Sequence, residues 1–371
     1  MQRRTFFAQV VAVIAFSALA GCSNSDKPVV PTGGPTPAGG TAAKRIVILT
    51  NGSAPYWDAA AAGAKDAEKD FKTEAAGFQL TFDRGDFTVE TQLNKLRQYA
   101  NASDVAAIAI SVTDAANQAL VEELKKLNEA GIKVVTIDSD VNREANVGLR
   151  FAYLGTDNKQ AGQMLGKAAK GLVENGNYAA FVGLKEAANA LDRVAGFQEA
   201  GGANYKRLDY LGDSPEGEVK ARSNVRDALE RNKDLNVLVG IWSYNTPAIV
   251  DIVKQLEARS QVKIVGFDAD PGAISGMQAG MVDAMIVQNP YEMGYQGVRV
   301  LKALVEKDEA TIKVMFPKHG EPGGDIYDTG LKIVVPNEGS PLKGELFDAN
   351  TKFLKLSEFQ VWLDKYSLTG S

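Results

Sequence analysis

Short apolar runs alternate with helical patterns along most of this chain, and this alternation constrains the fold more than any other feature. Residues 45–50 read RIVILT and precede YWDAAAAGAKDAEKDF; FQLTFD precedes ETQLNKLRQYAN, VAAIAISV precedes AANQALVEELKKLNEAG, and KVVTID closes the series. Strands that alternate with helices build a parallel sheet. Several runs are apolar throughout, as expected for strands that are buried on both faces.

A second series of the same kind begins at Phe151. It contains the runs FAYLG, YAAFVGL, RLDYLG, NVLVGIW, KIVGFD and DAMIVQ, with helical patterns between them. A chain of 371 residues is long enough for about two domains, and its 45% hydrophobic composition can fill their cores. The predicted fold is therefore α/β, with two doubly wound parallel-sheet lobes.

The N-terminal residues have the pattern of a secretion signal. Arg3 and Arg4 precede an apolar run, residues 6–20, which is too short for a membrane-spanning helix. LAGC, which ends at Cys22, then resembles the bacterial lipoprotein box, in which cleavage leaves a lipid-bearing cysteine at the new N-terminus. We predict a signal peptide at 1–21 and lipidation of Cys22. A chance cysteine after an ordinary signal is the alternative, and the export route, Sec or twin-arginine, stays open.

The segment 22–43 is predicted to be a flexible tether, because it is rich in proline and glycine and has few large apolar residues. Cys22 is the sole cysteine, so the mature chain has no internal disulfide. The formal charge of −5 becomes −7 once the two arginines of residues 1–21 are removed. Nothing in this balance indicates a nucleic-acid partner. We expect an extracytoplasmic, lipid-anchored monomer.

The polar and aromatic residues that follow the predicted strands form the candidate site, because ligands bind beyond the carboxyl ends of parallel strands. Fixed carboxylates and amides can take the hydroxyl groups of a sugar, and aromatic faces can cover its C–H patches. Each residue taken alone also fits helix capping or core packing. The candidate ligand-binding residues are Asn51, Tyr56, Trp57, Asp138, Asn189, Arg193, Trp242, Ser243, Asn245, Asp268 and Gln288.

The motifs APYWDAAAAGAKDA, VVTIDSD, ANALDRVAGF, IVGFDADP and VQNPYEMGYQGV occur in an order and spacing that resembles ribose-binding-type periplasmic sugar-binding proteins, the substrate-binding subunits of ABC transporters. The resemblance covers about residues 45–336. It implies that the aromatic pair Tyr56 and Trp57 sandwiches a sugar ring. It also implies that Asp138, Asp268 and Gln288 bind the sugar's hydroxyl groups, while Asn189 and Arg193 lie at or beside the ligand.

Three departures from the family pattern argue against assigning a pentose by analogy. Ser139 and Leu191 stand where the ribose type has arginines, whose fork of donors serine cannot imitate. The stretch WSYNTPA, residues 242–248, replaces the usual QNDEMA, so Ser243 or Asn245 is expected to do the work of the amide from a shifted position.

The resemblance also implies that the chain crosses between the lobes three times, near 155–158, 288–289 and 333–336, which together form a three-strand hinge. The first lobe is then predicted to comprise 44–156 plus 289–333, and the second 157–288 plus 334–371. The tail sequence FLKLSEFQVWLDKYSL has apolar positions at helical spacing and a candidate cap at Ser357. We expect it to pack on the body; a partner-binding face is the alternative.

No motif in the chain predicts a cofactor or a metal. Asp138, Asp140 and Asn142 begin like a calcium loop, but Arg143 and Leu149 occupy the positions of its glycine and its closing glutamate. No G-x-G-x-x-G follows a strand, and there is no P-loop. The sole histidine, His319, lies in a loop rich in proline and glycine, which disfavours a histidine-dependent triad.

Two classes of function follow from these observations. The first is a tethered binding protein, not an enzyme, that delivers a small sugar-like solute to the membrane subunits of an ABC importer or presents it to a sensor. The alternative is a secreted enzyme that acts on carbohydrate with Asp138 and Asp268 as a carboxylate pair. A transcription regulator of the same fold is disfavoured, because an export signal and a tether take the place of a DNA-binding head.

Overall fold

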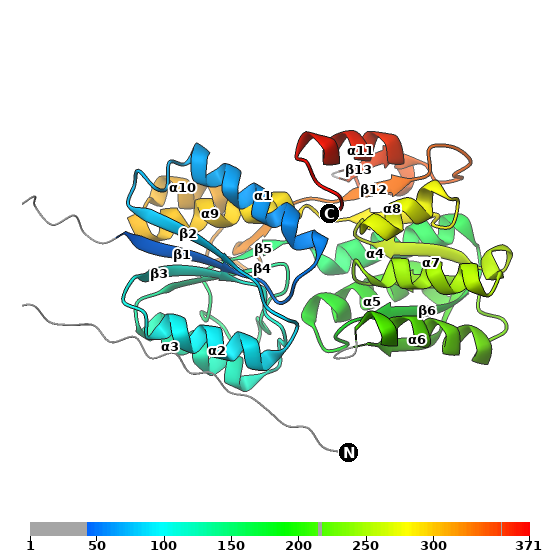
Figure 1. Cartoon of the computed structure of the whole chain (residues 1–371), viewed down its shortest axis with the longest axis horizontal. Helices are drawn as coiled ribbons and strands as arrows, with labels where there is room; N and C mark the ends of the chain where they lie inside the picture. The colour runs from blue at the N-terminus through cyan, green and yellow to red at the C-terminus, as the bar shows by residue number, and fades with distance from the viewer. Residues whose placement is uncertain (1–42, 214–216, 350) are drawn as a thin grey trace, which may run out of the picture. The chain divides into compact units, whose positions relative to one another are not determined.

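The computed structural model describes residues 43–213, 217–349 and 351–371. The predicted signal peptide, Cys22 and nearly all of the tether lie outside these residues. The described chain forms two sheets, each flanked by helices (Figure 1). The predicted fold, two doubly wound α/β lobes, is confirmed.

The sheet of the first lobe has the strand order β11-β5-β4-β3-β1-β2, and all of its pairs are parallel. Its strands are β1 (Lys44–Leu49), β2 (Phe78–Asp83), β3 (Val105–Ile110), β4 (Lys133–Ile137), β5 (Tyr153–Gly155) and β11 (Ile326–Asp328). Its helices are α1 (Pro55–Asp70), α2 (Val89–Ala100), α3 (Gln118–Glu129), α9 (Pro290–Glu306) and α10 (Glu309–Met315). One apolar cluster joins the sheet to α1, α9 and α10, and another joins its opposite face to α2 and α3.

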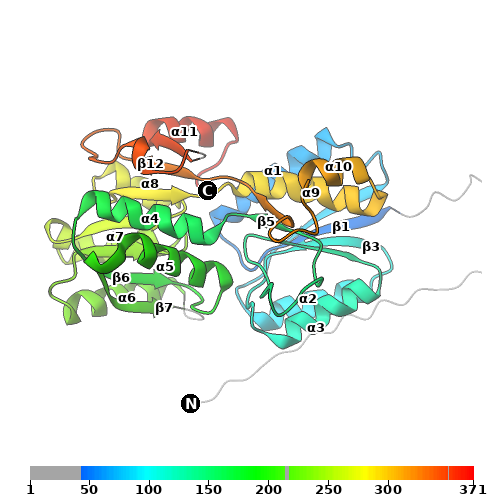
Figure 2. The same ribbon diagram turned by 180° about the vertical axis from the view of Figure 1, so that it is seen from behind.

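The sheet of the second lobe has the order β13-β12-β10-β9-β8-β6-β7, in which only the β10–β12 pair is antiparallel among the described strands. Its strands are β6 (Gly176–Val182), β7 (Tyr205–Gly212), β8 (Val237–Gly240), β9 (Lys263–Phe267), β10 (Ala284–Val287), β12 (Lys332–Val335) and β13 (Lys352–Lys355). Its helices are α4 (Asn158–Leu172), α5 (Ala188–Gly201), α6 (Glu218–Arg231), α7 (Asn245–Gln255), α8 (Pro271–Gln278) and α11 (Leu356–Lys365). Helices α4 and α5 cover one face (Figure 2), and α6, α7, α8 and α11 cover the other.

The chain passes between the two sheets at three places, which hydrogen bonds tie together. Thr329 N donates to Gly155 O at 2.8 Å, and Asn289 Nδ2 donates to Thr329 O at 3.3 Å. The third passage lies earlier than predicted, before Lys332 instead of near 333–336. Lys332 already pairs with Val287 in the second sheet, so residues 332–333 belong to the second lobe.

The tail forms the helix that its periodicity predicts, and this helix packs on the body. Phe359 and Leu363 are buried in a core cluster of the second lobe. The predicted cap at Ser357 is wrong, because α11 begins at Leu356 and Lys355 occupies the cap position. Lys355 N donates to Glu358 Oε2 at 2.7 Å, and Ser357 N donates to Asn337 Oδ1 at 2.8 Å, so these contacts stabilise the first turn.

Candidate functional site

A cavity lies where the carboxyl ends of both sheets face one another. Its walls are Asn51, Ala54, Tyr56, Trp57, Phe87, Asp138, Asn189, Arg193, Trp242, Ser243, Tyr244, Asp268 and Gln288. We call it the inner pocket. Ten of the eleven predicted ligand residues lie in these walls, and Asn245 is the exception. The first lobe and the second both contribute, so a molecule in the pocket contacts both.

Asp138 and Asp268 hold corresponding positions in the two lobes. Asp138 directly follows β4, and Asp268 directly follows β9. Both residues have left-handed backbone conformations, with φ of 61° and 64°, which aspartate tolerates better than most residues. The backbone N–H of Asp138 donates to Leu154 O, and that of Asp268 donates to Ile286 O, so neighbouring strands hold both turns. Each turn presents its carboxylate to the pocket.

Hydrogen bonds fix the carboxylates within the pocket. Tyr56 Oη donates to Asp138 Oδ1 at 3.0 Å, and Ser111 Oγ donates to Asp138 Oδ2 at 3.1 Å. Gln288 Nε2 donates to Asp268 Oδ1 at 3.0 Å. Burial raises the pKa of Asp138, and it raises the pKa of Asp268 to about 7, because an ionised carboxylate loses hydration there.

Arg193 places one positive charge near both carboxylates. Its guanidinium lowers the pKa of Asp138 and of Asp268 and so opposes the effect of burial. Nε donates to Asn158 Oδ1 at 2.9 Å, Nη1 donates to Ile241 O at 3.1 Å, and the group lies 3.8 Å from the centre of the Phe267 ring. These contacts hold the guanidinium rigidly.

Two buried polar atoms in the walls lack a hydrogen-bond partner among the described residues: Arg193 Nη2 and Gln288 Oε1. One is a donor and the other an acceptor. Burying a polar group without a hydrogen-bond partner destabilises the folded protein by about 1–3 kcal/mol, so each such atom calls for an explanation. A ligand hydroxyl can donate to Gln288 Oε1 and accept from Arg193 Nη2.

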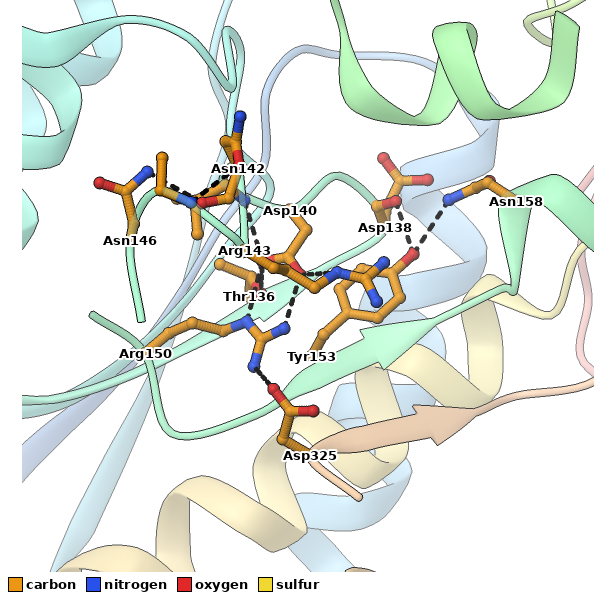
Figure 3. Close-up of polar contacts among 12 residues, drawn as sticks. Thr136, Asp138, Asp140, Asn142, Arg143, Asn146, Arg150, Tyr153, Asn158 and Asp325 are labelled. Atoms are coloured by element: carbon orange, nitrogen blue, oxygen red, sulfur yellow. Dashed lines mark hydrogen bonds and ion pairs between the residues drawn. The ribbon is translucent and has the colours of Figure 1, made fainter. Parts of the chain in front are cut away.

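A chain of hydrogen bonds connects the two sides of the pocket through the first passage between the lobes. Tyr153 Oη donates to the backbone O of Asp138 at 2.9 Å and accepts from Asn158 Nδ2 at 3.2 Å, as Figure 3 shows. Asn158 in turn holds Arg193. The position of Asp138 in one lobe is thereby linked to that of Arg193 in the other.

Each lobe contributes a tryptophan that is held by an asparagine. Trp57 Nε1 donates to Asn51 Oδ1 at 3.2 Å, and Trp242 Nε1 donates to Asn189 Oδ1 at 3.3 Å. Tyr56 meets Trp57 edge to face, with ring centres 5.0 Å apart. Hydrogen bonds therefore fix the orientation of both tryptophan rings, one in each lobe.

Asn245 does not line the pocket, contrary to the prediction. Its Oδ1 accepts from Trp242 N at 3.1 Å, and its Nδ2 donates to Asp213 Oδ2 at 2.8 Å. The side chain therefore turns back to hold the loop after β8. Of the two residues that were expected to replace the family's amide, only Ser243 lies in the pocket wall.

Ala54, Phe87 and Tyr244 line the pocket but were not predicted. Phe87 lies four residues beyond β2, and no residue after that strand was among the predicted ligand residues. Its φ of 64° is unusual for a bulky residue and has no signature in the sequence. Tyr244 lies between two residues that were predicted, so its position after β8 was a usable signal.

Asp140, which the calcium-like pattern includes, has a structural role instead (Figure 3). It forms ion pairs with Arg150 at 2.7 Å and Arg143 at 3.0 Å, and it accepts from Thr136 Oγ1 at 2.6 Å. Arg150 also pairs with Asp325. This network holds the loop after β4, and thus the turn that carries Asp138.

Metal-binding clusters and membrane-spanning helices are both absent from residues 43–213, 217–349 and 351–371. No group of three or more histidine, cysteine, aspartate or glutamate side chains is placed to hold a metal ion. None of the helices there combines the length and the apolar character that a membrane crossing requires.

Residues 45–309 match the model of the family described as "Periplasmic binding protein domain". This match covers more than half of the chain, and the chain belongs to that family of extracytoplasmic binding proteins. The resemblance to ribose-binding-type proteins is confirmed.

Three similar proteins illustrate the range of relatives. The ribose import binding protein RbsB of Escherichia coli is 24% identical over 67% of this chain and 79% of its own. An ABC transporter solute-binding protein from Agrobacterium vitis, solved with bound D-fucose, is 26% identical, with a TM-score of 0.68 over 78% of this chain and 95% of that one. XylFII, solved in a complex with LytSN, is 30% identical, with a TM-score of 0.64 over 71% of this chain and 94% of that one.

Proposed function

We propose that this protein captures a small sugar or sugar-like solute between its two lobes and delivers it to the membrane subunits of an ABC importer. One observation carries the proposal: Asp138 from the first lobe and Asp268 from the second line the same pocket, near the charge of Arg193. Relatives named for ribose import and for binding D-fucose support the same class of ligand.

The chemistry of the walls suits a polyhydroxylated ring. Ionised carboxylates accept hydrogen bonds from hydroxyl groups, and bonds to charged groups contribute about 1.5–3 kcal/mol each. Arg193 Nη2 can donate to a hydroxyl or ring oxygen, and Gln288 Oε1 can accept from a hydroxyl. The faces of Trp57 and Trp242 can pack on the C–H groups of the ring.

We propose binding without turnover. Asp138 and Asp268 each have fixed donors and share the electrostatic influence of Arg193, an arrangement that suits the recognition of hydroxyl groups. The alternative enzyme would use the same two carboxylates as an acid and a nucleophile or base. Chromatography of the ligand after prolonged incubation separates these cases: recovery of unchanged sugar supports binding, and accumulation of a product contradicts it.

The test is a thermal-shift screen of the mature protein against D-ribose, D-xylose, D-arabinose, D-fucose, D-glucose, D-galactose, polyols and nucleosides. A ligand at 100 times its dissociation constant adds about 2.7 kcal/mol to the free energy of unfolding. We expect at least one sugar to raise the melting temperature. If no sugar raises it while a nucleoside does, the proposed ligand class is wrong.

We also propose that the mature protein is a monomer anchored outside the cytoplasm by lipid on Cys22, a residue outside the described structure. A lipid anchor is expected to place the mature protein in the membrane fraction and to make labelling with a fatty acid depend on this cysteine. The Cys22→Ser variant should lose the label and the membrane association. Equal labelling of both proteins contradicts the anchor. Sedimentation of the mature protein without lipid tests the monomer.

Presentation of the sugar to a partner such as a membrane sensor is a second candidate, favoured by one observation: the relative XylFII was solved in a complex with a second protein, LytSN. Uptake of radiolabelled sugar by cells that lack this protein distinguishes the two. Loss of uptake supports import. Normal uptake together with a lost transcriptional response to the sugar supports sensing.

A further inference from the structure

A second cavity adjoins the inner pocket. We call it the outer cavity. The two cavities share four wall residues: Ala54, Phe87, Trp242 and Tyr244. The outer cavity is larger than the inner pocket, and its exposed wall residues, among them Ser53, Asp86 and Thr88, face solvent. A ligand that extends from the inner pocket past these shared residues therefore enters the outer cavity.

Phe87 and Trp242 form the partition between the two cavities. Their rings stack with centres 6.2 Å apart and an interplanar angle of 30°. Phe87 comes from the first lobe and Trp242 from the second. Both rings line both cavities, so each offers an aromatic surface at the junction.

The backbone conformation of Phe87 is strained, and the surrounding structure holds it. Its φ of 64° places a bulky side chain in the left-handed region, and such outliers cluster at ligand clamps. Phe87 N donates to Asn51 O at 2.7 Å. A Cβ atom on Gly52 would lie 2.2 Å from the Phe87 ring, so the missing side chain of Gly52 makes room for it. The local backbone therefore holds the Phe87 ring between the inner pocket and the outer cavity.

The remaining walls of the outer cavity present oriented acceptors. Asp213 accepts from Tyr244 Oη at 2.6 Å and from Asn245 Nδ2 at 2.8 Å. Asp86 Oδ1 accepts from Thr88 Oγ1 at 2.6 Å, and Asp270 Oδ1 accepts from Gly272 N at 2.8 Å. Fixed carboxylates beside aromatic rings repeat the chemistry of the inner pocket and suit hydroxyl groups for the same reasons.

We propose that the preferred ligand is a disaccharide, whose first ring occupies the inner pocket and whose second ring occupies the outer cavity. This inference rests on the proposed function and specifies its substrate class. The glycosidic bond would pass the Phe87–Trp242 partition. The second ring would pack against Tyr244 and donate hydroxyl hydrogen bonds to Asp86 or Asp270.

The test compares matched pairs of sugars by isothermal titration calorimetry: D-xylose with xylobiose, D-glucose with cellobiose and maltose, and D-galactose with lactose. The wild-type protein should bind at least one disaccharide about tenfold or more tightly than its monosaccharide, since each added hydrogen bond to a charged group contributes about that much. Binding of monosaccharides without any disaccharide overturns the inference and leaves the proposed function intact. No binding of either contradicts both.

A blocking variant ties the effect to the outer cavity. Ser53 is exposed and lines only the outer cavity, so Ser53→Trp fills space there with little cost to folding. It should weaken disaccharide binding by about tenfold or more and leave monosaccharide binding within about twofold, with Ser53→Ala as the matched control. Leu184→Trp provides a second block from the other lobe. Equal binding of the disaccharide by wild type and both tryptophan variants overturns the inference.

Discussion

Asp138 and Asp268, one in each lobe, occupy the same local geometry: each follows a parallel strand directly, with a φ near 60°, and each lies within the electrostatic influence of Arg193. The carboxylates are therefore a matched pair that faces one pocket from two sides. Neither lobe alone supplies the complete set of hydrogen-bonding groups.

Removing the charge of either aspartate should weaken sugar binding. Asp138→Asn and Asp268→Asn each forfeit hydrogen bonds to a charged group, which contribute about 1.5–3 kcal/mol, or about ten- to a hundredfold in affinity. Calorimetric titration with the sugar identified by thermal shift provides the measurement. Asp227→Asn, an exposed position on α6, is the control and should bind normally. Wild-type affinity in both pocket variants would exclude them as ligand residues.

The contribution of Asp268 to the stability of the ligand-free protein should fall as pH rises from about 4 to about 7. Burial raises the pKa of Asp268 from 3.8 to about 7, so in this range the folded state holds a proton that the unfolded state releases. The stabilisation is complete below the unfolded pKa and is lost as pH rises through the folded pKa. Asp138, whose pKa is also raised, contributes with the same sign.

Asp268→Asn should remove this contribution, because the group no longer titrates, so the stability of the variant should fall less, or rise more, than that of the wild type as pH increases. Urea unfolding of both proteins at pH 4.5, 6 and 7.5 gives the comparison. A wild-type slope that the variant reproduces would show that Asp268 titrates normally in the folded protein.

Close contact between α1 and α9 should make Gly294 intolerant of substitution. A Cβ atom there would lie 1.9 Å from Ala60 O, so Gly294→Ala must push apart the helix that carries Tyr56 and Trp57. We expect a loss of about 1–3 kcal/mol in the free energy of unfolding and weaker sugar binding. Gly297→Ala, whose Cβ would meet only Ile48 at 3.9 Å, is the control in the same helix. Equal effects of the two would refute the close-packing argument.

The tail helix should contribute to the stability of the second lobe. Phe359 is fully buried, and Phe359→Ala should cost about 3–5 kcal/mol through lost contacts and the cavity left behind. Val361 is 70% exposed on the same helix, and Val361→Ala should change stability by no more than about 0.5 kcal/mol. Denaturant unfolding measures both. A negligible effect of Phe359→Ala would leave the helix available for a partner instead.

The sequence predicted most of the pocket because one rule, that ligands lie beyond the carboxyl ends of parallel strands, applies to every strand in turn. Asp138 and Asp268 follow from it directly. Asn245 also obeys the rule, yet its amide holds Trp242 N and Asp213, because a first-turn side chain can turn back to its own loop. The position of a residue in the sequence does not show whether its side chain points into the pocket or back to its own loop.

Phe87 was missed for a different reason. It reaches the pocket only because a left-handed turn and the bare backbone of Gly52 direct its ring there.

The third passage between the lobes was predicted too far along the chain. Its position depends on the antiparallel pairing of β12 with β10, which begins at Lys332 and rests on tertiary contacts. The cap at Ser357 was wrong because Glu358 and Asn337, and not a serine hydroxyl, satisfy the first turn of α11.

The most direct test of the account is a crystal structure of the protein with the sugar found by the thermal-shift screen. We predict one sugar ring in the inner pocket, with its hydroxyl groups bonded to both Asp138 and Asp268, and with Arg193 Nη2 and Gln288 Oε1 paired to it. A sugar bound to residues of one lobe only, or bound outside the pocket with those two atoms still unpaired, would contradict the claim that the two lobes capture it together.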